Sequence, residues 1–566
     1  MSKPNQPSTT VSGAEAVVEM LRLHGVEILF GLCGDTSLPF YDALARLPHG
    51  MRHILARDER SAAYMADGYA RVSGKVGVCE GPSGGGVTYI LPGLAEANES
   101  SVPVLCINSD ISVAARGRYT LTELDQSALM RPVTKWNRVL DRAQDIPRFF
   151  RRAFNQMTTG RPGAAHIALP FDVQNGVVER GDLWGDATLN EYPAHRMAPE
   201  PCYNERAAQL LRDAKRPVFV CGGGVMIAQA ETELCSLAER LSAPVATTIS
   251  GKGSIAEDHP LAVGVVGSNG GTPETRAIVD EADLIIFVGC RAGSVTTERW
   301  RHPAPGTPKV IHIDVDADVI GVNYRVDAPL AGDAKLALAG LDQALAPFKR
   351  PLDAAGVEKA KEEKFAKFFA LAESDDQPIR PERVVAELTQ ALDADAIVAA
   401  DAGTPCPYIS AFYPARRTGR RIFSNRAHGA LGYSLPAAIG AHFAAPTVKS
   451  VSVMGDGSFG FACGELETAV RYKLPITFIV ISNSTFGWIK AGQRAGYGQR
   501  YFAVDFNTVD HAAVAAAFGV KSWRVTDPKD LGRILKQAIE FAGPTLVDIV
   551  CQPLHEANAP VSEWIA

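Results

Sequence analysis

The sequence lacks the patterns that mark several large classes of protein. Its 10 cysteines are scattered over 566 residues, with no C-x-x-C pair and no metal-type spacing. This distribution argues against a disulfide framework or a zinc site and predicts reduced thiols in a cytoplasmic protein. No apolar run is long enough to span a membrane, and the polar start of the chain contains no signal-peptide core. We therefore expect no membrane association.

The two signs of charge nearly balance, with 57 Lys and Arg against 63 Asp and Glu. The net charge is −6, and no block of basic residues is present, so a nucleic-acid partner is not expected. The composition, with 46% hydrophobic and 21% charged residues, is that of a globular protein. A chain of this length is expected to form three or four domains. A small-molecule substrate is the class of partner that remains.

Glycine, in contrast, is plentiful, and it recurs at the ends of short apolar runs. The runs at residues 26–31, 76–79 and 397–400 end in or near glycine-containing turns, and strand, turn and helix patterns alternate along the chain. Repeated units of this kind predict an α/β protein with doubly wound parallel sheets. Residues 182–202 and the Lys/Glu-rich stretch 347–378 are predicted to be linkers, the second with an exposed helix. Three domains are expected, at residues 12–181, 203–346 and 380–556.

The stretch at residues 451–493 is the most informative part of the chain. Apolar residues at 451–454 predict a short strand, which ends at the turn Gly-Asp-Gly-Ser. Helix-like apolar spacing follows at 461–472, and a second apolar strand is expected at 475–481. The stretch therefore predicts a strand–helix–strand unit with a glycine turn at its first strand end.

Two oxygen-bearing side chains, Asp456 and Asn483, stand at the carboxyl ends of these two strands. Open parallel sheets bind ligands at that edge. A hard cation such as Mg²⁺ prefers carboxylate, amide and phosphate oxygens, and a glycine turn before a helix admits a phosphate close to the backbone. The pair therefore predicts a magnesium–diphosphate site.

This pattern resembles the signature of thiamine diphosphate (ThDP) enzymes, in which a Gly-Asp-Gly turn is followed at a set distance by an Asn. The resemblance implies that Asp456, Asn483 and the backbone carbonyl of Thr485 hold Mg²⁺. The family often has a second Asn where this chain has Ser484. The implied contacts with the cofactor diphosphate are Gly455, Gly457 and Ser458.

Other segments of the last domain resemble cofactor-contacting parts of the same family. Gly403 and Thr404 stand where the family contacts diphosphate and pyrimidine, and Leu431 stands where a large apolar residue holds the two cofactor rings in a bent shape. His428 is a candidate proton relay, with a structural histidine as the equal alternative. The remaining implied cofactor contacts are Ala430, Phe486, Gly487 and Trp488.

Glu59 is the candidate catalytic residue. It lies where a predicted strand meets a predicted helix, so an acid in the first helical turn, favoured by the helix dipole, is one interpretation. The run Ala-Arg-Asp-Glu followed by YMADGYAR resembles the ThDP-enzyme segment in which a Glu hydrogen-bonds the aminopyrimidine ring of the cofactor. The resemblance therefore implies that Glu59 exchanges a proton with the cofactor in a pocket that raises its pKa.

The resemblance extends from about residue 12 to residue 553 and is closest to the acetolactate synthase-like group, which includes glyoxylate carboligases and 2-hydroxyacyl-CoA lyases. It implies a ThDP- and Mg²⁺-dependent carboligase, decarboxylase or lyase that acts on a 2-keto acid or an acyloin-type substrate. Thr122 replaces the catalytic-site Gln of acetohydroxyacid synthases, and Gly492 stands where they have a Trp. These differences predict a specialised enzyme and not the housekeeping acetohydroxyacid synthase. An enzyme like 2-hydroxyacyl-CoA lyase or oxalyl-CoA decarboxylase is the alternative.

The family also implies an assembly and a second cofactor. Its active sites are shared between subunits, which implies a homodimer or homotetramer. Gly222-Gly223-Gly224 lacks the G-x-G-x-x-G spacing, so a tight turn is preferred over a dinucleotide site. Residues 289–291 and 312–316 resemble segments near FAD in acetolactate synthases, which keeps FAD as a candidate. A flavin or nicotinamide oxidoreductase and a non-catalytic ThDP-binding subunit are the alternatives from other classes.

Overall fold

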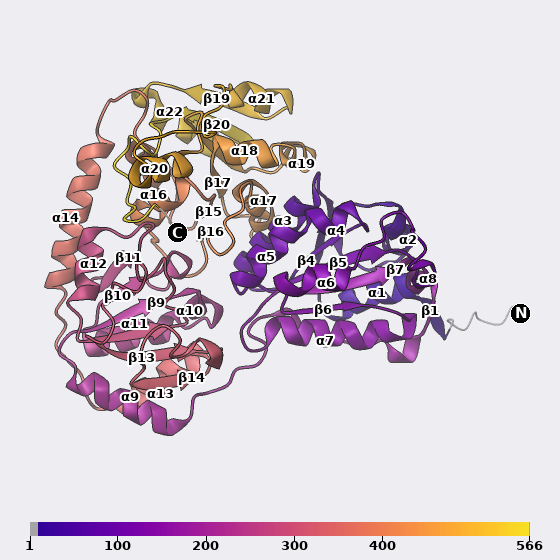
Figure 1. The fold of residues 1–566 in the computed structure, drawn as a ribbon, viewed down its shortest axis with the longest axis horizontal. Helices are drawn as coiled ribbons and strands as arrows, with labels where there is room; N and C mark the ends of the chain where they lie inside the picture. The colour runs from indigo at the N-terminus through magenta and orange to yellow at the C-terminus, as the bar shows by residue number, and fades with distance from the viewer. Residues whose placement is uncertain (1–8, 565–566) are drawn as a thin grey trace, which may run out of the picture. The chain divides into compact units, whose positions relative to one another are not determined.

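The computed structural model describes residues 9–564. The chain forms two compact units, one up to His195 and one from Arg196, and each is described by itself; Figure 1 labels their elements. Three six-stranded sheets make up the core, one in the first unit and two in the second, and every strand pairing within them is parallel. The predicted fold class is therefore confirmed.

The first unit contains the sheet with strand order β3-β2-β4-β5-β7-β6. Its central strands are buried throughout their length, as expected for apolar strands covered on both faces. Its strands are β2 (Ile28–Gly31), β3 (Arg52–Leu55), β4 (Gly77–Gly81), β5 (Val104–Asp110), β6 (Trp136–Val139) and β7 (Ala165–Pro170). The main helices are α1 (Gly13–Leu23), α2 (Leu38–Arg46), α3 (Glu59–Ser73), α5 (Leu91–Glu99) and α7 (Ile146–Thr158).

The second unit contains the other two sheets, with strand orders β11-β10-β9-β12-β13-β14 and β16-β15-β17-β18-β20-β19. The strands of the first of these are β9 (Pro217–Cys221), β10 (Val245–Thr247), β11 (Ala262–Val265), β12 (Leu284–Val288), β13 (Lys309–Asp314) and β14 (Ala328–Ala331). Those of the second are β15 (Ile397–Ala400), β16 (Ile422–Ser424), β17 (Ser450–Gly455), β18 (Thr477–Ser482), β19 (Lys521–Val525) and β20 (Thr545–Val550).

Each sheet has a switch point, a pair of neighbouring strands whose connections to the next strand run in opposite directions across the sheet. These points lie between β2 and β4, between β9 and β12, and between β15 and β17. The first and last sheets repeat the same strand order when each is counted from its own first strand. Ligands of open parallel sheets bind at such switch points, outside the carboxyl ends of the strands. The fold therefore offers one candidate site per sheet.

Several predicted elements have other boundaries. The helical stretch predicted over 461–472 starts earlier and is divided in two: α18 (Asp456–Ala462) begins in the glycine turn, and α19 (Glu465–Arg471) covers most of the predicted range. The chain becomes helical already at Asp456, and the break falls at Cys463-Gly464, where glycine disfavours continuation. The predicted linker 182–202 ends early, because α9 (Pro201–Asp213) begins on a proline suited to a first helical position.

The charged helix expected within 347–378 exists as α14 (Ala355–Ala372), but it is not wholly exposed. Figure 1 shows it running along the second unit, where it packs on α12 (Pro273–Asp280) and α15 (Pro381–Ala391). Lys364 and Phe368 are each only 4% exposed. One face of α14 is thus part of the interior. Within residues 9–564, no helix combines the length and apolar character needed to cross a membrane.

Candidate active site

The predicted magnesium ligands are joined by short hydrogen bonds. Asp456 opens α18 directly after β17, and Asn483 follows β18, the parallel neighbour of β17. Oδ2 of Asp456 accepts hydrogen bonds from the backbone N–H groups of Asn483 (2.7 Å) and Ser484 (2.6 Å). Oδ1 accepts from the N–H of Gly457 at 2.9 Å. Three backbone donors therefore hold this carboxylate in one orientation.

The side chain of Asn483 presents an unused acceptor. Its Oδ1 is buried and has no hydrogen-bond partner among the described residues, a costly state for a polar atom unless a ligand supplies the partner. Within residues 9–564, no group of three His, Cys, Asp or Glu residues could hold a metal ion. One carboxylate and one amide oxygen, completed by phosphate oxygens, match what Mg²⁺ takes. The residues present therefore fit a magnesium–diphosphate group.

Thr485 lies in an isolated antiparallel bridge with Asp505. The two hydrogen bonds of this bridge are made by the residues on either side of Thr485. The N–H of Phe486 donates to the carbonyl of Val504 (2.8 Å), and the carbonyl of Ser484 accepts from the N–H of Phe506 (3.0 Å). In such a pair the central residue points its own N–H and carbonyl away from the facing strand. The carbonyl of Thr485 is therefore outside the ladder, as a metal-ligating carbonyl must be.

Glycine leaves the backbone open at the switch point of the last sheet. Gly403 follows β15 with φ of +96°, and Gly455 ends the neighbouring strand β17. A Cβ atom at either position would meet no atom within 4 Å. A ligand can therefore approach the main chain closely at the carboxyl ends of β15 and β17.

The start of α20 (Gly487–Gly496) packs against both of these strand ends. A Cβ at Gly457 would lie 2.8 Å from Cε1 of Phe486, and a Cβ at Gly487 would lie 3.4 Å from Oγ1 of Thr404. The ring of Trp488 lies beneath the guanidinium of Arg426, at 5.6 Å. The structure thus brings together the predicted residues that follow β15, β17 and β18.

Two buried polar residues missed by the sequence interpretation hold the surrounding loops. Asp401 accepts from the N–H groups of Ser434 (3.0 Å) and Ala402 (3.1 Å), and Asn425 Oδ1 accepts from the same Ala402 N–H at 3.0 Å. Burial raises the pKa of Asp401 to about 6, against the lowering effect of its hydrogen bonds with Ser434 and Ser458. The only sequence signal was a polar residue directly after an apolar strand.

The loop between β16 and α17 (Ser434–Ala444) carries His428, Ala430 and Leu431. His428 is exposed, whereas Ala430 and Leu431 are half-buried. The carbonyl of Ala430 accepts a hydrogen bond from the side chain of Asn425. The loop meets α18 at Gly432, because a Cβ there would lie 2.7 Å from Cβ of Phe461.

Substitution Gly432→Ala is expected to destabilise this loop. Gly432 has φ of +83° and has no room for a Cβ, so alanine combines backbone strain with a clash and should lower the free energy of unfolding by about 1–3 kcal/mol. Urea unfolding measures the change. Gly460→Ala is the matched control, since it lies on α18 with open space around its Cβ position and should be neutral or stabilising. Equal effects of the two substitutions would contradict the assigned geometry.

In the first unit, Glu59 is the first residue of α3, after the N-cap Asp58. It is 7% exposed, and it lies against the turn that follows β4. A Cβ at Gly81 would be 3.2 Å from its Cγ, and a Cβ at Gly86 would be 3.1 Å from its Oε1. Burial raises the pKa of Glu59, and the neighbouring Asp58 and Glu80 add to the rise. A carboxyl group with a raised pKa at a switch point is suited to proton exchange.

A chain of hydroxyl groups lies at the same edge of the first sheet. Thr122 Oγ1 is 2.7 Å from Ser83 Oγ, which is 3.0 Å from Thr36 Oγ1, itself 2.7 Å from Ser109 Oγ. Thr122 has φ of +69°, uncommon for a β-branched residue. Its side chain lies against Gly84, where a Cβ would be 2.8 Å away. The substitution at position 122 thus places a hydroxyl where the resemblance predicts an amide.

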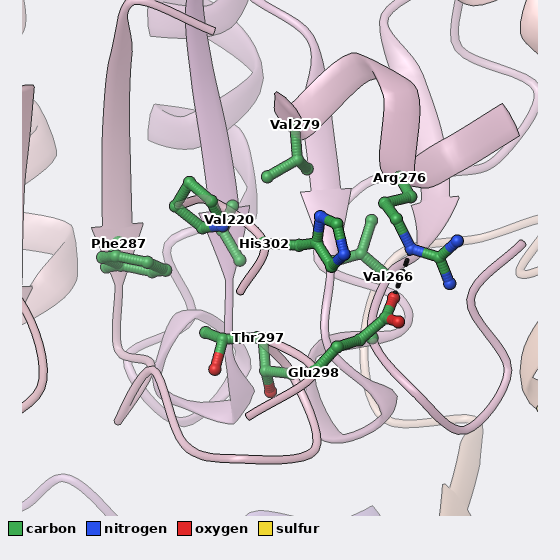
Figure 2. Close-up of a pocket in the computed structure, with 11 residues that line it drawn as sticks. Val220, Val266, Arg276, Val279, Phe287, Thr297, Glu298 and His302 are labelled. Carbon is green, nitrogen blue, oxygen red and sulfur yellow. Dashed lines mark hydrogen bonds and ion pairs between the residues drawn. The ribbon is translucent and has the colours of Figure 1, made fainter. Parts of the chain in front are cut away.

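The triple glycine of the middle sheet serves close packing. The N–H groups of Gly222 and Gly224 donate to the carbonyls of Val288 (2.9 Å) and Gly289 (3.1 Å), and a Cβ at Gly222 would lie 2.1 Å from the Gly289 oxygen. The glycines thus allow β9 and β12 to approach closely where the chain turns into α10 (Gly223–Ile227), and the tight turn stays the preferred interpretation. A separate small pocket of the same domain, shown in Figure 2 and lined by side chains such as Phe287, has a volume of about 10 Å³, room for about one water molecule.

Together these features define an enzyme built from three open parallel sheets, with a candidate phosphate- and metal-binding edge on the last one. Three family models match the chain in the same order. They are described as thiamine pyrophosphate enzyme N-terminal TPP binding domain (residues 11–129), central domain (204–341) and C-terminal TPP binding domain (401–549). The chain belongs to the thiamine pyrophosphate enzyme family.

Curated relatives cover nearly its whole length. It is 37% identical over 552 residues to a probable acetolactate synthase large subunit of Methanocaldococcus jannaschii, covering 96% of this chain and 92% of that protein. It is 32% identical to the acetolactate synthase large subunit of Lactococcus lactis subsp. lactis, covering 95% and 92%. It is 31% identical to the acetolactate synthase isozyme 3 large subunit of Escherichia coli K12, covering 94% and 92%. The chain is an acetolactate synthase-like, ThDP-dependent enzyme of carbon–carbon bond chemistry.

Proposed function

We propose that this enzyme is a ThDP- and Mg²⁺-dependent carboligase that joins an acyl unit from a 2-keto acid to a carbonyl acceptor. The observation that carries the proposal is the unpaired Asn483 Oδ1 beside the tethered carboxylate of Asp456, at the carboxyl edge of a sheet. The printed names of the relatives, acetolactate synthases, support the same reaction class. The domain boundaries 12–181, 203–346 and 380–556 are part of this proposal.

Each residue has a defined task in the proposed site. Asp456, Asn483 and the carbonyl of Thr485 hold Mg²⁺, while Gly403, Gly455, Gly457 and Ser458 let the diphosphate approach the main chain. The bound cofactor supplies an electron sink for acyl-anion chemistry. Glu59 holds or releases a proton at the pyrimidine ring, which its raised pKa favours. The further cofactor contacts proposed are Thr404, His428, Ala430, Leu431, Phe486, Gly487 and Trp488.

The substrate of this enzyme is proposed to differ from that of the housekeeping acetohydroxyacid synthase. The hydroxyl of Thr122 belongs to a chain of hydroxyl groups at the first sheet, where the resemblance predicts a longer amide. Gly492 leaves its position on α20 without a side chain, and the carbonyl of Trp564 lies 3.4 Å from where its Cβ would be. Both differences alter size and polarity at positions that resemble substrate-contacting ones. An acceptor other than the larger one that the Trp at the position of Gly492 helps to select in acetohydroxyacid synthases is therefore proposed.

The test combines cofactor removal with product analysis. Dialysis against a chelator is expected to abolish turnover, and ThDP with Mg²⁺ together, but neither alone, should restore it. Mass spectrometry of products from pyruvate, glyoxylate and 2-oxobutanoate, singly and in pairs, then identifies donor and acceptor. Turnover without ThDP would refute the proposal. Efficient formation of the mixed product from pyruvate and 2-oxobutanoate would refute the specialised role.

FAD stays a candidate for the middle domain, and no step of the proposed reaction depends on it. The visible absorption spectrum of the purified protein decides whether a flavin is bound, and bleaching on substrate addition would reveal a redox role. A homodimer or homotetramer with shared active sites is proposed for the assembly. Mixing the Glu59→Gln and Asp456→Asn proteins tests that arrangement.

A further inference from the structure

The second unit contains a cavity that is separate from the residues of the proposed active site. Its volume is about 400 Å³, within the range of small-molecule pockets. Its walls come from five segments: the start of α12 with the residues before it, one side of α14, the first turn of α15, the end of α16 (Pro405–Phe412), and residues 558–562 of the C-terminal tail. None of the residues assigned to ThDP or Mg²⁺ lines it.

Lys364 brings a buried charge to this cavity. It lies on α14 and is 4% exposed, and it has no hydrogen bond or ion pair within residues 9–564. Its Nζ lies 3.3 Å from where a Cβ of Gly264 on β11 would be, and 5.2 and 5.8 Å from the ring centroids of Phe365 and Phe412. Burial lowers the pKa of Lys364 to about 8, so the ammonium form still predominates at pH 7. A buried cation without an anionic partner is an expensive feature unless a ligand supplies that partner.

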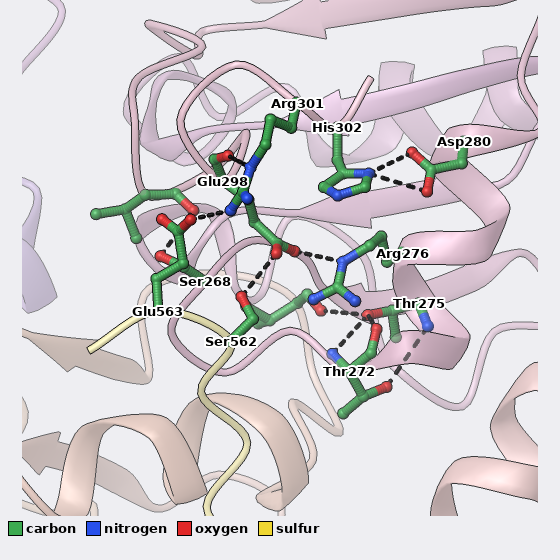
Figure 3. A network of polar contacts seen from close by, with 12 residues as sticks. Ser268, Thr272, Thr275, Arg276, Asp280, Glu298, Arg301, His302, Ser562 and Glu563 are labelled. Atoms are coloured by element: carbon green, nitrogen blue, oxygen red, sulfur yellow. Dashed lines mark hydrogen bonds and ion pairs between the residues drawn. The ribbon is translucent and has the colours of Figure 1, made fainter. Parts of the chain in front are cut away.

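The other cations of the cavity already have partners. Lys367 is 2.5 Å from Glu274, and Arg276 is 2.6 Å from Glu298. Figure 3 shows that Glu298 also accepts a hydrogen bond from the hydroxyl of Ser562, at 2.6 Å. Glu257 and Glu274 act on Lys364 only through space, and both already form ion pairs, with Lys252 and Lys367. Among the described residues, Lys364 therefore has no direct ion pair.

The start of α12 is not an open anion site either. Thr272 and Thr275 form a capping box, also visible in Figure 3, in which each side chain accepts from the backbone N–H of the other. The amide groups that could have bound a phosphate are thus partly used. This leaves one ammonium group, which suits a single carboxylate better than a phosphate-rich ligand.

A second unpartnered polar group lies in the same cavity. Glu382 on α15 is 1% exposed, and both of its carboxyl oxygens lack a hydrogen-bond partner among the described residues. Burial raises the pKa of Glu382, which favours a neutral carboxyl group that can donate a proton to an anion. The rest of the lining is largely apolar, with Phe368, Leu371 and Val561 among its members.

We propose that this cavity binds a small organic carboxylate with an apolar body, whose carboxylate pairs with Lys364 and whose body lies against Phe368, Leu371 and Val561. The ligand would contact the C-terminal tail, α14 and α12 at once. The inference does not rest on the proposed reaction, because Lys364 takes no part in it.

The experiment is titration calorimetry of the full-length protein, with ThDP and Mg²⁺ present, using 3-methylbutanoate as the probe. Its uncharged amide and the zwitterion leucine are the comparison compounds. The acid is expected to bind, and both comparison compounds should bind at least about tenfold more weakly. The amide lacks the negative charge that pairs with Lys364, and leucine adds an ammonium group that finds no anionic partner in the cavity.

Two variants locate the binding. Lys364→Met removes the charge but keeps an unbranched side chain only one atom shorter, and it should weaken binding of the acid by about tenfold or more. Lys359→Met is the matched control, because Lys359 is 77% exposed on the same helix and does not line the cavity, and it should bind like the wild type. Leu371→Trp should block the cavity by volume. Circular dichroism and ThDP-dependent turnover confirm that each variant is folded.

Several results would overturn the proposal. They are undetectable binding of the acid to the wild-type protein, equal binding by the wild type and Lys364→Met, and binding of the amide as tight as that of the acid. Equal binding by Lys364→Met would include the case in which the acid occupies only the active site. Tighter binding of leucine than of the acid would overturn the assignment of a neutral Glu382.

Discussion

Replacement of Asp456 by asparagine is expected to reduce kcat/KM by at least about 100-fold, because removal of groups that merely support a metal ligand already costs 10–100-fold. The carboxylate accepts three backbone hydrogen bonds, from Gly457, Asn483 and Ser484. Asparagine turns one acceptor into an NH₂ group that faces backbone donors, and it removes the negative charge that a divalent cation needs. Rates measured over a range of Mg²⁺ concentrations should show a much higher requirement for the metal.

Lowering the pH should increase the Mg²⁺ concentration that the wild-type enzyme requires, as the Asp456→Asn substitution does. Burial raises the pKa of Asp456 in the protein without metal, although its backbone hydrogen bonds lower it. A proton and Mg²⁺ then compete for the carboxylate, so the metal requirement of the wild type should rise as pH falls. Asp375→Asn, at an exposed position paired with Lys529, is the charge-matched control. A normal Mg²⁺ response of Asp456→Asn would exclude Asp456 as a metal ligand.

The sequence allowed the architecture and the chemistry-bearing strand ends to be predicted, because both depend on local patterns. Apolar runs ending in glycine marked the parallel strands, and Asp456 and Asn483 stand where two neighbouring strands end. The ends of helices were harder to predict where a glycine, which disfavours a helix, stands next to a charged residue that stabilises a helix start. The helix at the Gly-Asp-Gly turn begins at Asp456 itself, because the carboxylate there stabilises the first turn.

Features that depend on distant contacts were not predictable. Asn425 accepts a hydrogen bond from the N–H of Ala402, and Asp401 accepts one from the N–H of Ser434. These connections between loops distant in the chain are not revealed by any residue spacing. The lysine-rich helix α14 was expected to be exposed, yet one of its lysines, Lys364, is only 4% exposed and has its Nζ close to Gly264 of β11 and to the ring of Phe412. Charge along a helix predicts exposure only on average, and tertiary packing decides which face is covered.

Replacement of Glu59 by glutamine is expected to lower kcat by about 10²–10⁴-fold, the usual contribution of a positioned acid or base. Binding of ThDP should change little, since the amide keeps the shape of the side chain against Gly81 and Gly86. Steady-state rates and ThDP titrations by fluorescence quenching separate the two effects. A variant with wild-type kcat would remove Glu59 from the proposed chemistry, and Glu99→Gln at the half-buried end of α5 is the control.

The same Glu59→Gln substitution that lowers kcat should increase the stability of the folded protein at neutral pH. The pKa of Glu59 is raised by burial in the folded state, so the folded protein favours the protonated form. The wild type therefore loses stability as pH rises from the unfolded pKa through the folded one. Glu59→Gln cannot ionise and should melt at a higher temperature than the wild type near pH 7, with the difference vanishing below about pH 4. Lower stability of the variant at neutral pH would indicate a structural role instead.

A mixture of the two inactive variants tests whether each active site draws on two subunits. If Glu59 of one subunit serves the Asp456 of another, dimers of Glu59→Gln with Asp456→Asn contain one intact site and one doubly altered site. Half of randomly re-formed dimers are mixed, so about one quarter of the wild-type rate should return after dissociation and reassociation. If both residues act within one subunit, every site of the mixture carries one of the two changes, and no activity returns.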